Sequence, residues 1–453
     1  MRQKHRIQRA LTEAWLDLPY AKELEVIDDL LTSQPTIGEL AAQDLIGGDP
    51  ETGRPGMTGE EAIRALVLKQ ANQWSYSELW FQLHDSQTSR AFMGYGISDR
   101  VPSRSALAEN IKKLRAETLE SISRVVLDMA EKAGVEKGRK VRIDTTAVES
   151  NIHHPFESDQ LWDVVRVLTR SMKQAKELTA DELTITFADR TRRAKRRYRG
   201  AWNAKTKAKR REQYRDLLKV AREVMGAARR VAILLEDFSP KTAGASAKAA
   251  RIRGEILRVL ALADTLCDTT QRRVINDELV ASTEKVISIF EDHTDVIRKD
   301  RRETIYGHKI CLTGGASSLI LDCRVLEGNP ADSSLAVDAV RRQEEVYGRL
   351  PRQVALDGGF ASKINLAEIK GLGVQDVAFS KRRGLEISDM TKSTWVYRRL
   401  RDFRAGIEGC ISFLKRCFGL DRCSWRSFAS FKAYVQASVL SFNLLVLARH
   451  LLT

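Results

Sequence analysis

The chain has 453 residues, which is too long for one ordinary domain and suits roughly two to four. Hydrophobic residues make up 43%, so the chain can bury a sizeable core. The formal net charge is +15, which favours a polyanionic partner, and nucleic acid is the first candidate. The six cysteines contain no C-x-x-C pair, which argues against a zinc site. The N-terminal residues contain no apolar signal-peptide segment, which argues against secretion. Both observations favour a reducing, cytoplasmic location.

Residues 1–135 have a helical pattern. Thr58 and Glu61 form a capping-box sequence, and the apolar positions that follow them recur at helical spacing. Ser103 or Ser105 is placed to begin one long amphipathic helix that ends near Gly134. We expect a helical N-terminal domain that binds DNA, dimerises, or does both.

In residues 139–149, Val141 and Ile143 alternate with basic residues, which predicts a strand that Asp144 ends. Glu149 lies nearby and is interpreted as structural or solvated, with contact to a metal ion as the alternative. The adjacent histidines at positions 153 and 154 are interpreted as surface residues, with contact to DNA as the alternative.

Residues 150–300 are again helical and very polar. Between residues 190 and 230, seventeen Lys or Arg face three acidic residues, so nearly the whole net charge lies here. So one-sided an excess favours contact with DNA phosphates over an ordinary solvated helix face. Tyr198 and Trp202 either stack on a DNA base or pack against other side chains of the protein. The predicted DNA-binding side chains are Arg192, Arg193, Lys195, Arg196, Arg197, Arg199, Lys205, Lys207, Lys209, Arg210 and Arg211.

Residues 306–325 predict two strands joined by a Gly-Gly turn, and His308 in the first strand is interpreted as structural. Asp332 is interpreted as the N-cap of a helix that runs to about residue 346, with a functional role as the alternative. Strands are predicted at residues 354–357 and 375–380, and helices fill most of 396–450. The apolar segment Ala437–Leu452 is too short and too polar to span a bilayer, so we expect a buried helix there.

Transesterification of DNA needs an activated oxygen nucleophile and a neutralised leaving oxygen, and two metal ions roughly 3.5–4 Å apart can serve both needs. Mg²⁺ prefers oxygen ligands and keeps several waters, so a few carboxylates at the ends of rigid elements suffice. Asp144 ends one predicted strand, and Asp357 ends another and precedes Gly358, which permits a close approach. We predict both as catalytic metal ligands. Asp322 and Asp376 are weaker candidates, because neither precedes a glycine.

Glu408 is the third predicted carboxylate. Arg404, Glu408 and Lys415 follow one another at spacings of four and seven residues, so they share one helix face. A carboxylate flanked in this way by two cations suits a metal ligand with neighbours that bind phosphate. A surface ion pair between Arg404 and Glu408 is the alternative.

At these residues the chain resembles the Asp-Asp-Glu (DDE) transposases of bacterial insertion sequences, and the ISNCY group is the subfamily that the resemblance suggests. The matching segments are IDTTAVES around Asp144, the hairpin YGHKICLTGGASSLILDCRV, ALDGGFAS around Asp357, and the R, E and K of the Y-R-E-K signature. The tyrosine of that signature falls at Arg401. The resemblance also covers TGEEAIRALVLKQANQWSYSELWF in the N-terminal part, but it does not cover residues 160–300.

The resemblance implies an RNase H-like α/β catalytic core with a helical N-terminal domain and a basic helical insertion. The expected boundaries are 1–135, 136–158 with 300–453, and 159–299. It also implies strand cleavage and transfer with two Mg²⁺ ions held by Asp144, Asp357 and Glu408, with Mn²⁺ as a substitute, while Arg404 and Lys415 support Glu408 or bind phosphate.

The expected partners are double-stranded DNA, as terminal inverted repeats and as target, and a second copy of the chain in a homodimer or higher oligomer. No membrane is expected, and the expected location is the bacterial cytoplasm, in association with the nucleoid. Two alternatives remain open: an RNase H-like nuclease that cuts without joining, and a DNA-binding relic without catalysis.

Overall fold

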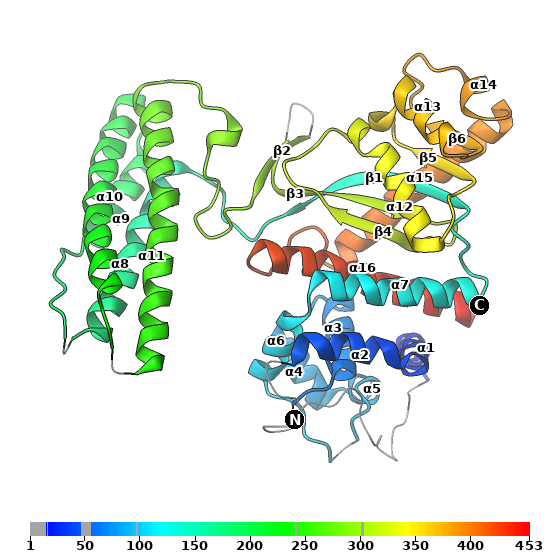
Figure 1. Ribbon diagram of the computed structural model, residues 1–453, viewed down its shortest axis with the longest axis horizontal. Helices are drawn as coiled ribbons and strands as arrows, with labels where there is room; N and C mark the ends of the chain where they lie inside the picture. Colours follow the sequence, from blue (N-terminus) through cyan, green and yellow to red (C-terminus); the bar gives the residue numbers. More distant parts are fainter. Residues whose placement is uncertain are drawn as a thin grey trace. The chain divides into compact units, whose positions relative to one another are not determined.

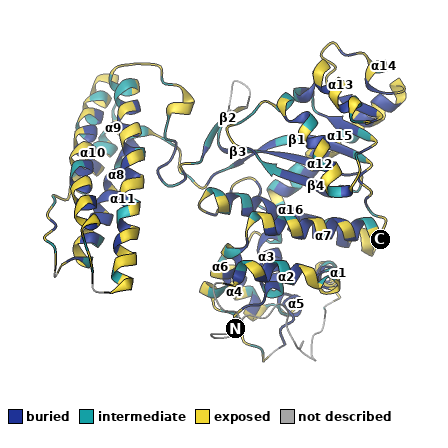
Figure 2. Cartoon of the chain, viewed as in Figure 1, coloured by how far each residue is buried: buried dark blue, intermediate teal, exposed yellow. Residues whose placement is uncertain are grey.

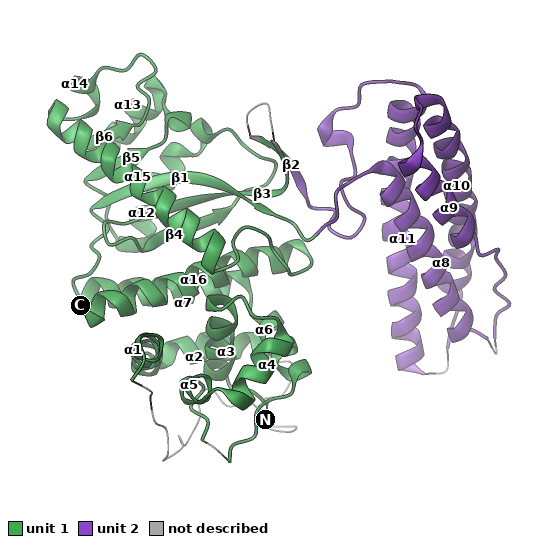
Figure 3. Cartoon of the chain, turned by 180° about the vertical axis from the view of Figure 1, so that it is seen from behind, with its two compact units in different colours: residues 1–151, 297–453 green, residues 152–296 purple. Residues whose placement is uncertain are grey.

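The computed structural model describes residues 15, 17–46, 56–96, 98–180, 182–240, 242–299 and 303–453 (Figure 1). The chain folds into two compact units, shown in Figure 3: residues 1–151 with 297–453, here named the core unit, and residues 152–296, here named the inserted unit.

The described N-terminal part of the core unit is helical, as the sequence predicts. Its helices are α1 (Pro19–Ser33), α2 (Pro35–Leu45), α3 (Gly59–Ala71), α4 (Tyr76–Asp85), α5 (Gln87–Phe92), α6 (Arg104–Lys113) and α7 (Ala116–Lys132). The predicted capping box of α3 is confirmed, because the Glu61 N–H donates to Thr58 Oγ1 at 3.0 Å and the Thr58 N–H donates to Glu61 Oε2 at 2.8 Å.

The single long helix predicted to start near Ser103 is wrong. Ser103 does cap a helix, but α6 ends at Lys113, and Leu114 and Arg115 are extended before α7 begins. The reason is a tertiary contact: the Asp44 carboxylate accepts hydrogen bonds from the Arg115 backbone N–H at 2.8 Å and from its guanidinium at 2.5 Å. An amide held by a side chain in this way cannot also continue the helical ladder.

The centre of the core unit is a six-stranded mixed sheet. Its strands are β1 (Lys140–Glu149), β2 (Asp295–Lys299), β3 (Glu303–Gly314), β4 (Ile320–Val325), β5 (Gln353–Leu356) and β6 (Asp376–Phe379). The order is β2-β3-β1-β5-β6, and β4 also pairs with β3. β1 is antiparallel to β3, whereas β1, β5 and β6 are mutually parallel. The predicted hairpin with its Gly-Gly turn is confirmed by the antiparallel pairing of β3 and β4.

The remaining helices of the core unit are α12 (Ala336–Tyr347), α13 (Lys363–Gly371), α14 (Ile387–Met390), α15 (Thr394–Cys417) and α16 (Phe428–Leu452). Helix α15 packs against β1, β5 and β6, and therefore spans the parallel part of the sheet. This position brings the middle of α15 to the strand ends that carry the predicted carboxylates.

Helix α16 is long and apolar enough to cross a membrane by length and composition alone, but 72% of its most apolar window is buried inside the protein. It packs against α1, α3, α7 and β4, and Figure 2 shows it largely in the colour of buried residues. Two of its polar residues are held by partners elsewhere in the core unit: Asn443 exchanges hydrogen bonds of 2.7 and 2.8 Å with the backbone of Ile320, and Arg449 pairs with Glu23 at 2.7 Å. The prediction of a buried helix is confirmed.

The inserted unit is a helical bundle with its own hydrophobic core. Its main helices are α8 (Glu157–Leu178), α9 (Thr191–Asn203), α10 (Lys207–Glu236) and α11 (Ala243–Thr270), and α11 continues into one π-helical turn at Gln271–Ile275. Leu168, Leu217 and Ile256 lie in this core, whereas the outward faces of the helices are exposed (Figure 2).

Candidate active site

Asp144 lies where the pairing of β1 changes. Parallel pairing with β5 ends at Ile143 opposite Leu356, whereas antiparallel pairing with β3 continues to Glu149. The prediction that Asp144 ends the strand is therefore wrong, because β3 continues to pair with the residues beyond it. Asp144 and Asp357 nevertheless follow directly after the last parallel pair of β1 and β5. The two strands therefore place both carboxylates at the same edge of the parallel part of the sheet.

Asp357 leaves β5 at the start of a 3₁₀ turn, Gly358–Phe360. The Ser380 hydroxyl, at the end of β6, donates a hydrogen bond of 2.8 Å to the Asp357 carboxylate. Gly359 is required here, because a Cβ at that position would lie 2.6 Å from Oδ2 of Asp332. Gly359 thus lets the Asp332 carboxylate approach the turn, while Gly358 leaves room for the Lys381 side chain.

Arg404 joins the three predicted carboxylates. Its Nη1 atom lies 3.2 Å from Asp144 and 3.2 Å from Asp357, and its Nη2 atom pairs with Glu408 one turn along α15. The Arg404 side chain is only 13% exposed. Three carboxylates from three separate segments therefore converge on one buried guanidinium.

The two aspartates of this cluster titrate differently. Burial raises the pKa of Asp144 to about 6, with the nearby carboxylates of Asp357 and Glu408 adding to the rise, although the Thr145 backbone N–H and Arg404 oppose it. Burial also raises the pKa of Asp357, but hydrogen bonds from Ser380 and the backbone, together with Arg404, outweigh it and leave the pKa below its ordinary value. Asp144 is thus the carboxylate for which a neighbouring cation has the largest stabilising effect.

The cluster lines a cavity of about 890 Å³, to which Thr145, Asp332 and Lys415 also contribute. Lys415 Nζ lies 3.5 Å from Asp421, one of the other lining residues. Across the residues that the structure describes, no group of three or more His, Cys, Asp or Glu is arranged to hold a metal ion, and the three carboxylates instead pair with Arg404. Their oxygen-only chemistry nevertheless suits Mg²⁺ or Mn²⁺.

Asp332 also lines this cavity, although the sequence favours a helix N-cap over a functional role for it. It begins a 3₁₀ turn and does not cap α12, so the N-cap interpretation is wrong. Its carboxylate accepts a hydrogen bond of 3.0 Å from Thr145 Oγ1, beside Asp144, and one of 3.2 Å from Lys309 Nζ. Lys309 is the feature of the sequence that could have indicated this role. It lies in β3 opposite Ala147 of β1, which places a cation near the strand that carries Asp144.

The competing aspartates have structural partners. Asp322, on β4, forms an ion pair of 2.7 Å with Arg342 of α12. Asp376 accepts a hydrogen bond of 2.9 Å from the Gln353 amide and one of 3.0 Å from the Lys392 backbone N–H. Neither lines the cavity of the three carboxylates.

The candidate histidines also lie outside this cavity. His308 is buried against Phe428 and Phe431, with ring centroids 4.8 and 5.0 Å away, as its structural interpretation expects. In the inserted unit, His153 lies 3.5 Å from the Asp163 carboxylate, and the ring of His154 lies beside a phenylalanine.

Two further positions face away from the carboxylates. Arg401, which stands at the tyrosine position of the signature, is exposed and lies 3.8 Å from Asp402. Glu149 lies 3.9 Å from Arg422, and both side chains are about half exposed. Neither Arg401 nor Glu149 lines the cavity.

The basic side chains of the inserted unit divide into two groups. Arg193 and Arg197 both pair with Asp216, and Arg211 pairs with Asp277, so these three are half-buried and hold the helices together. The other predicted DNA-binding residues are exposed: Arg192, Lys195, Arg196, Arg199, Lys205, Lys207, Lys209 and Arg210. Of the interleaved aromatics, Trp202 packs edge-on against Phe156 and donates a hydrogen bond of 3.1 Å to a carboxylate of α8.

Comparison with known protein families gives two matches. Residues 17–113 match a family model described as a transposase domain (DUF772), and residues 285–444 match one described as a transposase DDE domain. No curated protein and no solved structure matches the chain. The second match includes Asp357, Arg404, Glu408 and Lys415, whereas Asp144 precedes it.

Proposed function

Because the chain belongs to the DDE transposases of insertion sequences, enzymes that act on DNA by hydrolysis and transesterification, we propose that Asp144, Asp357 and Glu408 are its catalytic carboxylates. The reaction is metal-dependent strand cleavage followed by strand transfer at the ends of the element. The observation that carries this proposal is the convergence of the three carboxylates on the guanidinium of Arg404. Such a cluster stabilises a cation at the point where three elements meet.

Enzymes of this family generally depend on divalent metal ions, and the proposed ions are two Mg²⁺, for which Mn²⁺ can substitute. When bound, the ions would supply activation of the attacking oxygen and neutralisation of the leaving oxygen. Asp144, Asp357 and Glu408 would hold them through hard oxygen ligands. Arg404 and Lys415 line the same cavity and carry the charge that binds and orients the DNA phosphates.

The catalytic core is proposed to be RNase H-like and to comprise residues 136–158 and 300–453. The mixed sheet supports this assignment, since β1 is antiparallel to β3 and parallel to β5. The helical region 1–135 is proposed to contribute to DNA binding or dimerisation. Cleavage at two element ends favours a homodimer or higher oligomer.

Residues 159–299 are proposed to bind the DNA backbone through the exposed basic side chains of α9 and the first turns of α10. Seven exposed basic side chains of α9, of the start of α10 and of the segment between them form no ion pair with a described residue: Arg192, Lys195, Arg196, Arg199, Lys205, Lys209 and Arg210. Phosphate neutralisation by such residues releases counterions and makes binding depend steeply on salt.

The test is incubation of the full-length chain with labelled element ends, a target plasmid and Mg²⁺. Joined products of element end and plasmid are expected. Cut ends without joined products would instead indicate a nuclease. Binding that needs no metal, with no cut product from any substrate, would indicate a DNA-binding relic.

A further inference from the structure

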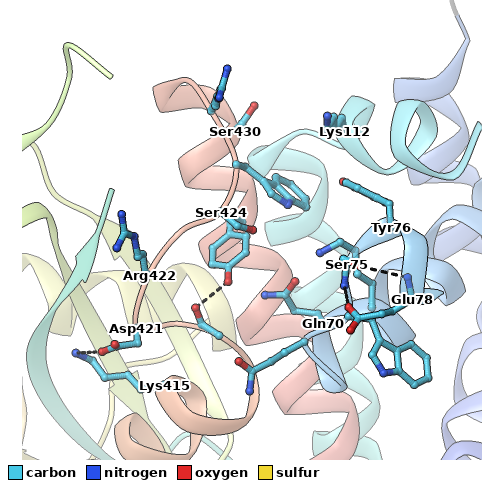
Figure 4. A pocket seen from close by; sticks show the side chains of 17 residues that line it. Gln70, Ser75, Tyr76, Glu78, Lys112, Lys415, Asp421, Arg422, Ser424 and Ser430 are labelled. Atoms are coloured by element: carbon cyan, nitrogen blue, oxygen red, sulfur yellow. Dashed lines mark hydrogen bonds and ion pairs between the residues drawn. The ribbon is translucent and has the colours of Figure 1, made fainter. Parts of the chain in front are cut away.

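A second cavity lies within the core unit beside the candidate active site. It has a volume of about 790 Å³ and is here named the adjoining pocket. Figure 4 shows Tyr76 and Lys112, from the N-terminal helices, on one side and Lys415 and Arg422 on the other. Gln73, Lys415 and Asp421 line both this pocket and the cavity of the catalytic carboxylates. Anything bound at the carboxylates can therefore extend into the adjoining pocket.

Cationic side chains predominate in the adjoining pocket. Its lining holds two carboxylates, Glu78 and Asp421, and five cationic residues: Lys69, Lys112, Lys415, Arg422 and Arg426. Glu78 is engaged in the capping box of α4, where the Ser75 backbone N–H donates to it at 2.7 Å. The pocket therefore carries a net positive charge that suits an anion such as phosphate.

One of these cations is unusually placed. Lys69 is only 7% exposed, and its ammonium group lies 5.0 Å from the centroid of the Tyr76 ring, while that of Lys112 lies 5.5 Å from the same ring. Burial lowers the pKa of Lys69 to about 8. Two ammonium groups beside one ring repel each other, and an anion placed near them would relieve that repulsion.

Four aromatic side chains also line the pocket: Trp74, Tyr76, Trp425 and Tyr434. The Tyr76 hydroxyl and the Trp425 indole N–H are buried, and neither has a hydrogen-bond partner among the described residues. Trp425 as a whole is 6% exposed. Buried donors without partners are costly in a folded protein, so two of them at one pocket indicate a ligand that accepts hydrogen bonds.

The two sides of the pocket are fixed to each other. The Gln70 amide donates hydrogen bonds of 2.8 Å to the Phe418 carbonyl and 2.7 Å to Ser438 Oγ. The neighbouring Gln73 amide donates one of 2.5 Å to the Arg416 carbonyl. Because these bonds connect α3 to the end of α15 and to α16, the pocket is formed before any ligand binds.

We propose that the adjoining pocket receives an unpaired nucleotide of the DNA strand that is processed at the carboxylates. This inference rests on the proposed function. The cations would bind the phosphates, and the aromatic rings and their donors would bind the base. A paired base within a duplex hides its faces by stacking, so a duplex backbone alone would use the cations but leave the aromatic lining without a role.

The experiment measures binding of the full-length chain, in EDTA to prevent cleavage, to a blunt duplex and to the same duplex with a short single-stranded extension. The extension is made with ordinary bases, with abasic sites, or with a fluorescent adenine analogue. Lys112→Gln removes a lining cation, and Tyr76→Phe removes a hydroxyl that has no protein partner. Lys113→Gln is the matched control, because Lys113 is the next residue of α6, pairs with Glu109 at 3.0 Å and does not line the pocket.

The expected result is tighter binding of the extended duplex than of the blunt one, with quenching of the adenine analogue. Lys112→Gln should lower the salt slope for the extended DNA by about 0.7, and Tyr76→Phe should weaken its binding about fivefold. Lys113→Gln should change neither. Equal effects of Lys112→Gln and Lys113→Gln, or abasic extensions that bind as well as ordinary ones, would overturn the inference. This binding experiment needs no cleavage. A failure of the proposed catalysis would appear only in the separate experiment with labelled element ends and a target plasmid.

Discussion

The guanidinium of Arg404 lies 3.2 Å from the carboxylate of Asp144, yet the pKa of that carboxyl group is raised to about 6. The desolvation of Asp144 thus outweighs the attraction of its nearest cation. A carboxylate in this condition is incompletely compensated by the protein alone, and it gains more from a further positive charge than an exposed carboxylate does.

The first prediction concerns stability and pH. Asp144 binds its proton more tightly in the folded chain than in the unfolded chain, where the pKa is near 3.8. The free energy of unfolding should therefore decrease as the pH rises from about 4 to about 6, and the loss should persist above that range. Asp144→Asn should remove this contribution and raise the free energy of unfolding at pH 7 by on the order of 2 kcal/mol, since the raised pKa already includes the attraction of Arg404.

Urea unfolding of the metal-free chain across this pH range checks the prediction. Asp322→Asn is the control, because Asp322 forms its ion pair with Arg342 on another part of the sheet. The same pH dependence in wild type and Asp144→Asn would contradict the origin assigned to the shift.

The second prediction concerns catalysis. Asp144→Asn, Asp357→Asn and Glu408→Gln keep the side-chain shapes but remove the charges that would hold the metal ions. Each should reduce strand cleavage by at least about a hundredfold, while DNA binding in EDTA stays within a small factor of wild type. Gel analysis of labelled element ends gives the first quantity, and anisotropy gives the second. Full cleavage activity in any one variant would remove that residue from the site.

The third prediction concerns Asp332, which lines the same cavity and contacts Thr145 and Lys309. Asp332→Asn weakens the ion pair with Lys309 and should lower cleavage about tenfold, in the range of residues that position metal ligands. Raising the metal concentration should recover part of the loss. Asp338→Asn is a matched control, since Asp338 pairs with Arg324 outside the cavity. An Asp332→Asn enzyme with wild-type metal dependence would show that this carboxylate has no part in the site.

The fourth prediction separates charge from scaffold in the inserted unit. Arg192→Gln with Arg196→Gln removes two exposed cations and should reduce the slope of log binding constant against log salt by about 1.8. Arg193→Gln with Arg197→Gln removes the same charge but breaks the pairs with Asp216. That second variant should mainly lower the melting temperature of the inserted unit. Equal salt slopes in the first variant and wild type would exclude phosphate contact at these residues.

Local patterns were enough to predict much of the fold. The capping box at Thr58, the strands at Ile143 and Leu356 and the Gly-Gly hairpin are each determined within a few residues. The break between α6 and α7 was not predictable in this way. It contains no Gly or Pro, and it depends on Asp44, which lies 71 residues from Arg115.

The candidate site shows the same division. Asp144 and Asp357 could be proposed because each follows a short apolar strand, and Glu408 because it shares a helix face with two cations. For Asp332 the sequence context favours an N-cap over a functional role, and only the pairing of β3 with β1 brings Lys309 to its carboxylate. The internal roles of Arg193 and Arg197 likewise depend on the register between α9 and α10, which fixes where Asp216 lies.

The packing of α16 has a consequence for the order in which the protein can fold. This helix fills the space between α1, α3 and α7, although it is separated from α7 by about three hundred residues of chain. A nascent chain that has emerged only as far as α7 lacks this apolar partner, so its first helices cannot complete their core. Chains interrupted before α16 would expose that apolar surface to chaperones and proteases. Because α16 contacts α1, α3 and α7 and also β4, it is one of the connections between the first helices and the sheet that a shortened chain would lack.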